Sequence, residues 1–600
     1  MKPLLILLCS AFTLATLAQS TDKRFAGLDA EFASVLKNWH AVGFAVAVVE
    51  KNKIIYEKGF GWRDVEKKLP VTPNTLFAIG SCTKAFTSAL IGLLQKDGKV
   101  DFDKPAHTYL PELKFYNDAM NNSITLRDMM SHRTGLPRHD ISWYLFSSGS
   151  RDSIMQRIQY QEPTAVVRDR WQYNNFMFTA QGAVVEKFTG KSWEDNVRDK
   201  FFKPLGMKAS NFTIKEWETN KDAAIGYGIK KDSIIKKLDY YNIAAMGPAG
   251  AINSSVHEMA NWVITWINGG KFNDKEIIPG NYFTQAISPQ AITGAGLPSK
   301  ERPDLFFSTY GFGWGLSSYK GHYRVEHGGN IDGFSASTSF YPTDSIGIIV
   351  LSNQNGSSVP GIIRNLISDR LLNEKYYDWN TEQKKAADKN KATQAQTKKS
   401  VVSTRKLNTV PSHTLKDYTG TYHHPGYGNL VVSLDKDSLF AKGNEKVFWL
   451  RHYHYDVFDI FEKDKGGIDT TDGPEPFKFQ FQMNASGDIE SLTAPFEAGL
   501  KPIVFTKQLK AKEIKKEDLQ KYTGEYELNG GIVKLYIKND KTLYALVPGQ
   551  PEYELVPVDK DKFGLKILSG YFIQFSVDDK NKVNDLTFIQ PNGNFKAVKK

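Results

Sequence analysis

Ser81 and Lys84 are two residues whose types and spacing could together perform chemistry. They lie three positions apart in the segment AIGSCTKAFTSALIGLLQKDG, where a long apolar run begins. Residues three apart on a helix share one face, with Cβ atoms about 5–6 Å apart. A lysine in an apolar environment has a lowered pKa, so it can take the serine proton or lower the serine pKa by its charge. The spacing predicts an activated serine near a helix N-terminus, where backbone N–H groups favour an oxyanion.

Two later motifs strengthen this interpretation. They are needed because Ser-x-x-Lys alone is also explained by a serine N-cap and an exposed lysine. Tyr173-x-Asn175 stands just before a second apolar helix, in RWQYNNFMFTAQGAVVEKFTG. His327-Gly328-Gly329 ends a strand-like run, where glycines let a substrate backbone approach closely. The structural alternative for Tyr173-x-Asn175 is a packed aromatic residue at 173 and a helix cap at 175.

In order and spacing, these motifs resemble those of the serine β-lactamase and penicillin-binding protein superfamily, which carries Ser-x-x-Lys. The resemblance is to the class C-like branch, with its esterases, D-aminopeptidases and DD-peptidases, and covers roughly residues 24–372. Further family-like stretches are MMSHRTGLP (129–137), GPAGAINSS (247–255) and YGFGWGL (310–316). The resemblance implies an α+β fold, with an antiparallel sheet, helices on both faces of that sheet, and a helical subdomain.

The resemblance also implies roles for the motif residues. Ser81 would be the nucleophile that forms an acyl-enzyme, and Lys84 would lower its pKa and shuttle the proton. Tyr173 would act as general base or acid, although which of Lys84 and Tyr173 takes the proton stays open, because coupled groups titrate together. Asn175 would hydrogen-bond the substrate amide. The backbone N–H groups of Ser81 and Asn330 would form the oxyanion hole.

His327-Gly328-Gly329 departs from the Lys-Thr/Ser-Gly motif that many family members carry. The lysine is a fixed cation that helps to hold a substrate carboxylate, whereas histidine is mostly neutral at pH 7. The departure favours ester or amide substrates without an essential carboxylate, including peptides that contain D-residues. The alternatives are a β-lactamase and a penicillin-binding sensor that is acylated without turnover.

The hydrophobic pattern predicts the elements that position these residues. Residues 43–62 are typical of a β-hairpin, and the apolar spacing that follows Ser81 predicts a helix that ends at Gly98. Residues 322–353 contain three strand-like runs, and residues 359–372 have helical periodicity. A layered sheet with helices on its faces accommodates this pattern.

An internal repeat follows the hydrolase-like region. LKDYTGTY (415–422) recurs as LQKYTGEY (519–526), and each copy precedes short alternating strands, which predicts two small all-β barrel-like domains. The repeats resemble lipocalin-like C-terminal domains. We therefore expect a signal peptide (1–18), a hydrolase domain (19–374), a basic linker (375–411) and two β domains (412–510 and 511–600).

The N-terminal sequence MKPLLILLCSAFTLATLAQS is typical of a secretory signal cleaved after Ala18, and it predicts a secreted or periplasmic protein. A membrane anchor is the alternative, but the apolar run is shorter than the ~20 residues that span a bilayer. The net charge is +11, and residues 375–406 carry nine Lys or Arg against three acidic residues. We interpret this segment as a solvated linker rather than a nucleic-acid surface.

The cysteine count and the spacing of possible ligand residues limit which other functions we expect. The chain has two cysteines, and Cys82 is alone after signal cleavage, so no internal disulfide is expected. No residue spacing supports a metal site or a cofactor. We expect a small-molecule or short peptide substrate, no nucleic-acid partner, no integral membrane segment after signal cleavage, and a possible homo-oligomer.

Overall fold

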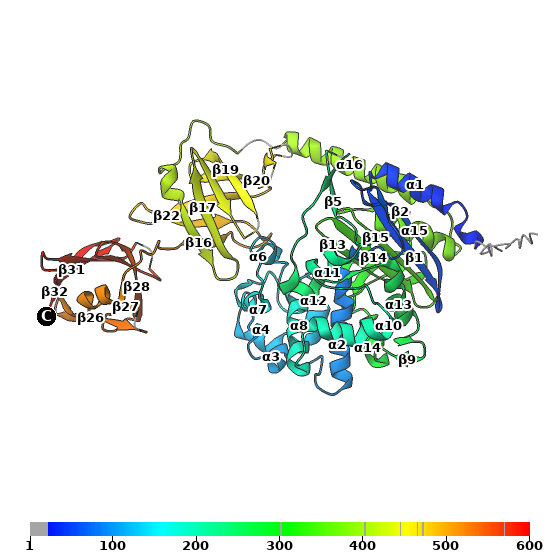
Figure 1. Ribbon diagram of the computed structural model, residues 1–600, viewed down its shortest axis with the longest axis horizontal. Coiled ribbons are helices and arrows are strands. Elements are labelled where there is room, and N and C mark those ends of the chain that lie inside the picture. The colour runs from blue at the N-terminus through cyan, green and yellow to red at the C-terminus, as the bar shows by residue number, and fades with distance from the viewer. Residues whose placement is uncertain are drawn as a thin grey trace, which may run out of the picture. The chain divides into compact units, whose positions relative to one another are not determined.

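The computed structural model describes residues 22–231, 233–300, 303–400, 404–444, 446–464, 466–470, 473–539, 541–568 and 570–600 (Figure 1). The predicted signal peptide lies outside these residues. The chain divides into two compact units. Of the described residues, the sheet unit comprises 22–96, 194–241 and 250–396, and the barrel unit comprises 97–193, 242–249 and those from 397 to 600. Within the described ranges, every helix is too short or too polar to cross a membrane.

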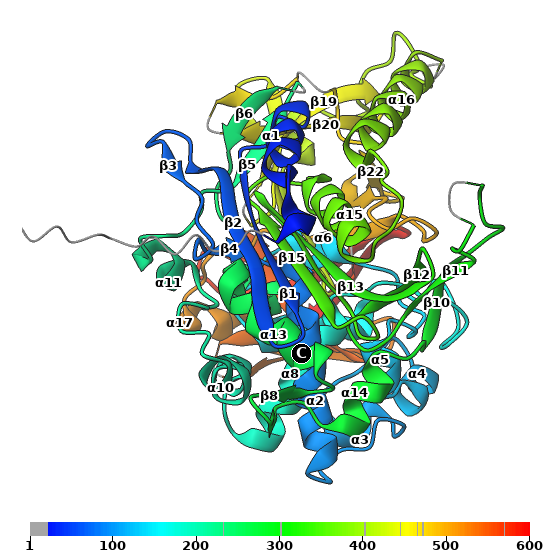
Figure 2. The same cartoon turned by 90° about the vertical axis from the view of Figure 1, so that its right-hand side faces the viewer.

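The sheet unit is built on one nine-stranded antiparallel sheet with the order β10-β11-β12-β13-β14-β15-β1-β2-β3. Figure 2 shows this order from β3 on the left to β10 on the right. The early hairpin therefore joins the late strands, as predicted. The strands are β1 (Gly43–Glu50), β2 (Lys53–Asp64), β3 (Leu69–Pro70), β10 (Ala291–Ala295), β11 (Phe307–Tyr310), β12 (Gly315–Tyr319), β13 (His322–Ile331), β14 (Phe334–Tyr341) and β15 (Ile346–Ser352).

Helices cover both faces of this sheet. Val46, Val48 and Ile348 share a hydrophobic core with α1 (Leu28–Asn38) and α15 (Val359–Leu371). Alternate residues of a strand face opposite sides, so Gly347 faces the other layer. A Cβ on Gly347 would lie 2.3 Å from the Val263 side chain of α13 (Val256–Ile267). The predicted α+β layering, with helices on both faces of an antiparallel sheet, is confirmed.

The predicted helix after Ser81 also forms in the sheet unit. A 3-10 turn, η2 (Gly80–Thr83), leads directly into α2 (Lys84–Lys96), which ends before Gly98. Two short strands, β4 (Phe77–Ala78) and β7 (Asn253–Ser254), pair just before this turn. The hydroxyl of Thr83 accepts a 3.1 Å hydrogen bond from the backbone N–H of Ile252. These contacts fix the backbone from which Ser81 projects.

The barrel unit begins with a helical lobe, which we define as residues 97–193. Its longest helix, α8, follows Asn175 directly and is apolar and buried along most of its length. Thr125 and Asp128 form a capping box at the start of α5, so this short helix is held by reciprocal hydrogen bonds. The helices are α3 (Ala106–Tyr109), α4 (Asp118–Ser123), α5 (Leu126–Met130), α6 (Asp140–Tyr144), α7 (Arg151–Gln156) and α8 (Phe176–Thr189).

Two eight-stranded barrels complete the barrel unit, which confirms the prediction of two small β-barrels. In the first barrel β19 pairs with β20 and closes the ring, and β21 is an additional short strand beside β20. Its strands are β16 (Gly420–His424), β17 (Gly428–Asp435), β18 (Ser438–Lys442), β19 (Val447–His454), β20 (Val457–Asp464), β21 (Gly467–Ile468), β22 (Lys478–Met483), β23 (Ile489–Ala494) and β24 (Ile503–Lys507).

The second barrel closes through the pairing of β25 with β32. The interior of an eight-stranded barrel is narrow enough to be filled by its own side chains. Its strands are β25 (Gly524–Leu528), β26 (Gly531–Lys538), β27 (Thr542–Leu546), β28 (Glu552–Asp559), β29 (Lys562–Leu565), β30 (Phe572–Val577), β31 (Val583–Gln590) and β32 (Gly593–Lys599).

The repeated tyrosines make equivalent contacts in the two barrels. In the first, the Tyr422 hydroxyl donates a 2.8 Å hydrogen bond to the Tyr418 carbonyl; in the second, Tyr526 donates a 2.9 Å bond to the Tyr522 carbonyl. Tyr418 also donates to Asp456, and Tyr522 donates to Asp561. The repeat LKDYTGTY/LQKYTGEY therefore encodes one local structure used twice.

Most of the predicted linker is helical. Helix α16 (Trp379–Ser400) is rich in Lys, Ala and Gln, which are good helix formers even without an apolar face. Lys385 and Glu382, three residues apart, form a 2.7 Å ion pair on this helix. Low apolar content alone does not separate an exposed helix from an irregular linker.

Candidate active site

Ser81 and Lys84 are joined by a hydrogen bond. The Lys84 Nζ atom donates to Ser81 Oγ over 2.9 Å. The Lys84 side chain is fully buried, whereas Ser81 is half-buried. A buried ammonium group is costly unless it is hydrogen-bonded or it gives up its proton. This pair therefore has the geometry of a nucleophile beside a proton acceptor.

The backbone of the His-Gly-Gly strand lies directly against Ser81. A Cβ on Gly329 would be only 1.9 Å from the Ile79 carbonyl oxygen and 3.3 Å from the Ser81 backbone nitrogen. Gly80 has φ +50°, and a Cβ there would lie 2.9 Å from the Asn330 backbone nitrogen. Only glycine permits this close approach. The two amide nitrogens predicted to stabilise an oxyanion thus lie on backbone segments in direct contact.

His327 is a neutral hydrogen-bonded side chain. Its Nδ1 donates to the Gly328 carbonyl over 2.6 Å, and its Nε2 lies 2.8 Å from the Tyr310 hydroxyl. Because a carbonyl can only accept, Nδ1 carries the proton and Nε2 accepts from Tyr310. Burial, and then the nearby charge of Lys84, lower the pKa of His327 to about 4. The side chain therefore supplies no fixed cation at neutral pH.

Cys82, next to the candidate nucleophile, is a packing residue. It is 2% exposed, and its thiol donates a 3.2 Å hydrogen bond to the His327 carbonyl. Burial raises the pKa of Cys82 to about 11, so the reactive thiolate is disfavoured.

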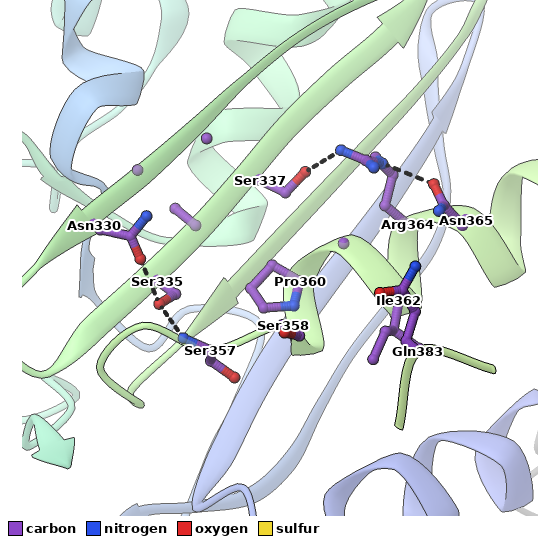
Figure 3. A pocket seen from close by; sticks show the side chains of 14 residues that line it. Asn330, Ser335, Ser337, Ser357, Ser358, Pro360, Ile362, Arg364, Asn365 and Gln383 are labelled. Atoms are coloured by element: carbon purple, nitrogen blue, oxygen red, sulfur yellow. Dashed lines mark hydrogen bonds between the residues drawn. The ribbon is translucent and has the colours of Figure 1, made fainter. Parts of the chain in front are cut away.

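A polar cavity of about 350 Å³ borders Gly328–Asn330, under the start of α15. Figure 3 shows Ser335 between Asn330 and Ser357, to which it is hydrogen-bonded. The cavity is large enough for a small polar group. It is lined by Gly328, Gly329, Asn330, Ser335, Ala336, Ser337, Ser357, Ser358, Pro360, Gly361, Ile362, Arg364, Asn365 and Gln383.

Arg364 is the cation in this cavity, and it is paired. Its guanidinium forms an ion pair with Glu326, which also lies 3.1 Å from Arg324. Burial alone would raise the pKa of Glu326, but the two arginines outweigh burial and lower it. Glu326 therefore stays ionised and offsets part of the positive charge beside the cavity.

Tyr173 and Asn175 lie in the barrel unit, at the start of α8. The Tyr173 ring is partly exposed and packs 4.2 Å from the His132 ring, measured between ring centroids. The Arg138 guanidinium lies over the Tyr173 ring, 4.8 Å from its centroid. A cation therefore lies against the face of the Tyr173 ring. The Asn175 side chain makes no capping hydrogen bond to α8. Its Nδ2 instead donates to Asp140 Oδ1 over 2.9 Å, so the interpretation of Asn175 as a helix cap does not fit.

His132 holds the backbone on either side of Tyr173 through hydrogen bonds. It is fully buried, and its Nδ1 accepts a 3.1 Å hydrogen bond from the Asn174 backbone N–H. The His132 carbonyl accepts a second bond, of 2.7 Å, from Gln172. These contacts fit a structural role for the MMSHRTGLP stretch.

The structure adds residues that sequence reasoning missed. Arg138 and Asp140 contact Tyr173 and Asn175, and they follow MMSHRTGLP directly in the chain. Tyr310 contacts His327 and begins the stretch YGFGWGL, so its position, though not its partner, was available from sequence. Among the described residues, no cluster of three or more His, Cys, Asp or Glu side chains could hold a metal ion.

A serine that is hydrogen-bonded to a buried lysine at the start of a helix, beside an antiparallel sheet, is the arrangement expected of a serine hydrolase. The chain belongs to the Beta-lactamase family, whose sequence model matches residues 28–372. A second match, to a domain of unknown function (DUF3471), covers residues 404–507 and thus the first barrel.

The chain is similar to curated relatives over much of its length, and it shares its fold with a solved structure. The chain is 30% identical over 447 residues to unguisins hydrolase ungD' of Aspergillus campestris, covering 70% of this chain and 80% of the relative. It is 24% identical over 346 residues to protein flp of Staphylococcus aureus, covering 57% of this chain and 65% of flp. The octameric penicillin-binding protein homologue from Pyrococcus abyssi superposes with a TM-score of 0.52 at 20% identity, over 80% of this chain and 99% of that one.

Proposed function

We propose that this serine hydrolase works through an acyl-enzyme on Ser81 and cleaves an ester or amide bond, including bonds in peptides that contain D-residues. The observation that supports the proposal best is the 2.9 Å hydrogen bond from the buried Lys84 to Ser81. The name of the fungal relative, an unguisins hydrolase, supports hydrolysis as the reaction.

The proposed reaction has two stages. Ser81 Oγ bonds to the substrate carbonyl carbon, and its proton passes to Lys84 or Tyr173. The backbone N–H groups of Ser81 and Asn330 stabilise the oxyanion, and Asn175 hydrogen-bonds the substrate amide. The C–O or C–N bond then breaks, and the leaving alcohol or amine takes up the proton. Water next attacks the acyl-enzyme, which releases the acid and restores the Ser81 hydroxyl.

The charges around His327 support substrates without an essential carboxylate. Burial and the Lys84 charge keep the pKa of His327 at about 4, so this ring is neutral at pH 7. Arg364 is engaged with Glu326. A penicillin-like carboxylate would meet neither a fixed lysine nor an unpaired arginine at this strand, unlike in family members with Lys-Thr/Ser-Gly.

Turnover of a substrate panel tests the proposal. The mature protein is assayed with p-nitrophenyl butyrate, D-alanine p-nitroanilide and benzylpenicillin, beside Ser81→Ala. We expect Ser81-dependent turnover of the ester or the anilide that exceeds that of benzylpenicillin. Faster hydrolysis of benzylpenicillin would instead identify a β-lactamase, and acylation without turnover of any compound would identify a sensor.

Export is a second part of the proposal and is supported by the sequence of residues 1–18. Expression of the full chain in a bacterial host, followed by intact mass measurement, tests it. Loss of residues 1–18 from the extracytoplasmic product is expected, and an uncleaved N-terminus would contradict it.

A further inference from the structure

The first barrel is docked on the helical lobe through the segment 139–146. Leu145 and Phe146 of the lobe are 3% and 0% exposed and belong to the hydrophobic core of the first barrel. The Phe146 ring stacks on Phe505 of β24, with 5.6 Å between ring centroids. Two side chains of the lobe therefore fill the interior of this barrel.

Polar contacts surround these two side chains. The Ser142 hydroxyl donates a 2.6 Å hydrogen bond to the Gly426 carbonyl, and the Asn444 N–H donates a 3.2 Å bond to the Leu145 carbonyl. His139 Nδ1 lies 3.1 Å from the Tyr427 hydroxyl. His139 and Ser142 are buried, so the contact excludes water and fixes the segment on the barrel.

The same segment contacts Asn175 directly and Tyr173 through the preceding residue, Arg138. Asp140, the first residue of α6, accepts hydrogen bonds from Asn175 Nδ2 over 2.9 Å and from Arg138 Nε over 2.6 Å. Arg138 in turn lies over the Tyr173 ring. Because a carboxylate only accepts, Asp140 orients the Asn175 amide with its NH2 group toward α6.

Trp143 of the segment and Glu497 of the barrel both lie close to Asp140. The Trp143 indole donates a 2.8 Å hydrogen bond to Asp140 Oδ1, which fixes the carboxylate on its own helix. Glu497, in the connection between β23 and β24 of the barrel, lies near the His139 backbone. Burial, and then the nearby Asp140 charge, raise the pKa of Glu497 to about 7.

We propose that the first barrel is a structural part of the active site: by docking on residues 139–146 it holds Asp140, a positioning residue, against Asn175 and, through Arg138, against Tyr173. This inference rests on the proposed function for the roles of Tyr173 and Asn175. It assigns the barrel a task in catalysis without giving it a group that touches the substrate.

Two phenylalanine truncations in the full chain separate docking from barrel stability. Phe146→Ala removes the docked ring. Phe481→Ala removes a ring from the same core that packs on Tyr418, Tyr422 and Phe458, away from the lobe. Hydrogen–deuterium exchange of peptides covering residues 171–178 is measured with the acylation rate of Ser81.

We expect Phe146→Ala to speed exchange at residues 171–178 and to slow acylation by about 100-fold, because a misplacement of about 1 Å can have this effect. Phe481→Ala should leave both within about twofold. Equal effects of the two variants on exchange and rate would overturn the proposal.

Asp140 supplies a second test that leaves the barrel core intact. Asp140→Ala should lower kcat by at least tenfold with a smaller change in KM, and Asp140→Glu should restore part of kcat. Unchanged kcat in Asp140→Ala would also overturn the proposal. If exchange responds to Phe146→Ala but turnover does not depend on Ser81, the docking inference stands and the proposed function fails.

Discussion

Lys84 donates its hydrogen bond to Ser81 from a side chain that is completely buried at the first residue of α2. The spacing of three residues is sufficient because the 3-10 turn of η2 leads straight into the helix. A solvent-exposed lysine at this spacing would be surrounded by water, whereas the buried Lys84 amine is held against the Ser81 hydroxyl.

Replacing Lys84 tests its part in the chemistry. Lys84→Met keeps much of the side-chain volume and removes the amine, so we expect the acylation rate to fall by about 10²–10⁴-fold, the usual range for a lost acid–base group. The fold should survive, because a buried charge is replaced by an apolar group. The rate is measured in single-turnover experiments with an activated ester, and circular dichroism controls for folding. A rate within tenfold of the wild-type value would exclude Lys84 as an essential proton acceptor.

Gly328 and Gly329 provide a matched pair of variants on one strand. A Cβ on Gly329 would meet the Ile79 carbonyl at 1.9 Å, whereas a Cβ on Gly328 would lie 3.7 Å from its nearest neighbour. Gly329→Ala should cost about 1–3 kcal/mol of stability or more and shift the oxyanion-stabilising amides. We expect kcat/KM to fall by at least about 100-fold in Gly329→Ala, and we expect the melting temperature to change little in Gly328→Ala. Similar melting temperatures for both variants would show that the close contact of Gly329 is not needed.

The lowered pKa of His327 predicts a specific dependence of stability on pH. Its folded value is about 4, against an ordinary value of 6.5, so the unfolded chain binds the proton first as the pH falls. Stability is therefore retained above pH 6.5 and lost progressively between pH 6.5 and pH 4, by about 3 kcal/mol at most. Denaturant unfolding of wild type and His327→Gln across this range measures the effect. The variant should lose less stability on acidification, and identical pH dependence would contradict a neutral His327.

The repeated tyrosines predict two separate stability effects. Tyr522→Phe removes the 2.6 Å hydrogen bond to Asp561 in the second barrel, and Tyr418→Phe removes the equivalent bond to Asp456 in the first. Each change should destabilise its own barrel by about 1–2 kcal/mol. Hydrogen exchange should localise the loss to β25–β32 for Tyr522→Phe, with acylation of Ser81 unchanged. Protection lost equally in both barrels would argue against this local role.

Much of the fold was predictable because its signals are local. The hairpin at residues 43–62, the helix after Ser81 and the helix at 359–372 each follow from periodicity and turn residues in one short stretch. The two barrels were predictable because the repeat LKDYTGTY/LQKYTGEY marks two copies of one domain.

The residues that were missed depend on contacts between distant parts of the chain. Asp140 bonds to Asn175, 35 positions away, and Glu326 pairs with Arg364, 38 positions away. Neither pairing leaves a trace in local periodicity. The insertion of Phe146 into the first barrel joins segments more than 250 residues apart, so an isolated aromatic residue gave no indication of it.

The most direct test of the account is the intact mass of the protein after brief reaction with an activated ester that leaves an acyl group. The wild type, Ser81→Ala and Cys82→Ala are compared, because Cys82 is the neighbouring alternative nucleophile. If Ser81 is the nucleophile, one acyl adduct forms on the wild type and on Cys82→Ala, and it maps to the peptide that contains Ser81. No adduct forms on Ser81→Ala. An adduct that persists in Ser81→Ala, or turnover by that variant at the wild-type rate, would contradict the assignment of Ser81 as the nucleophile.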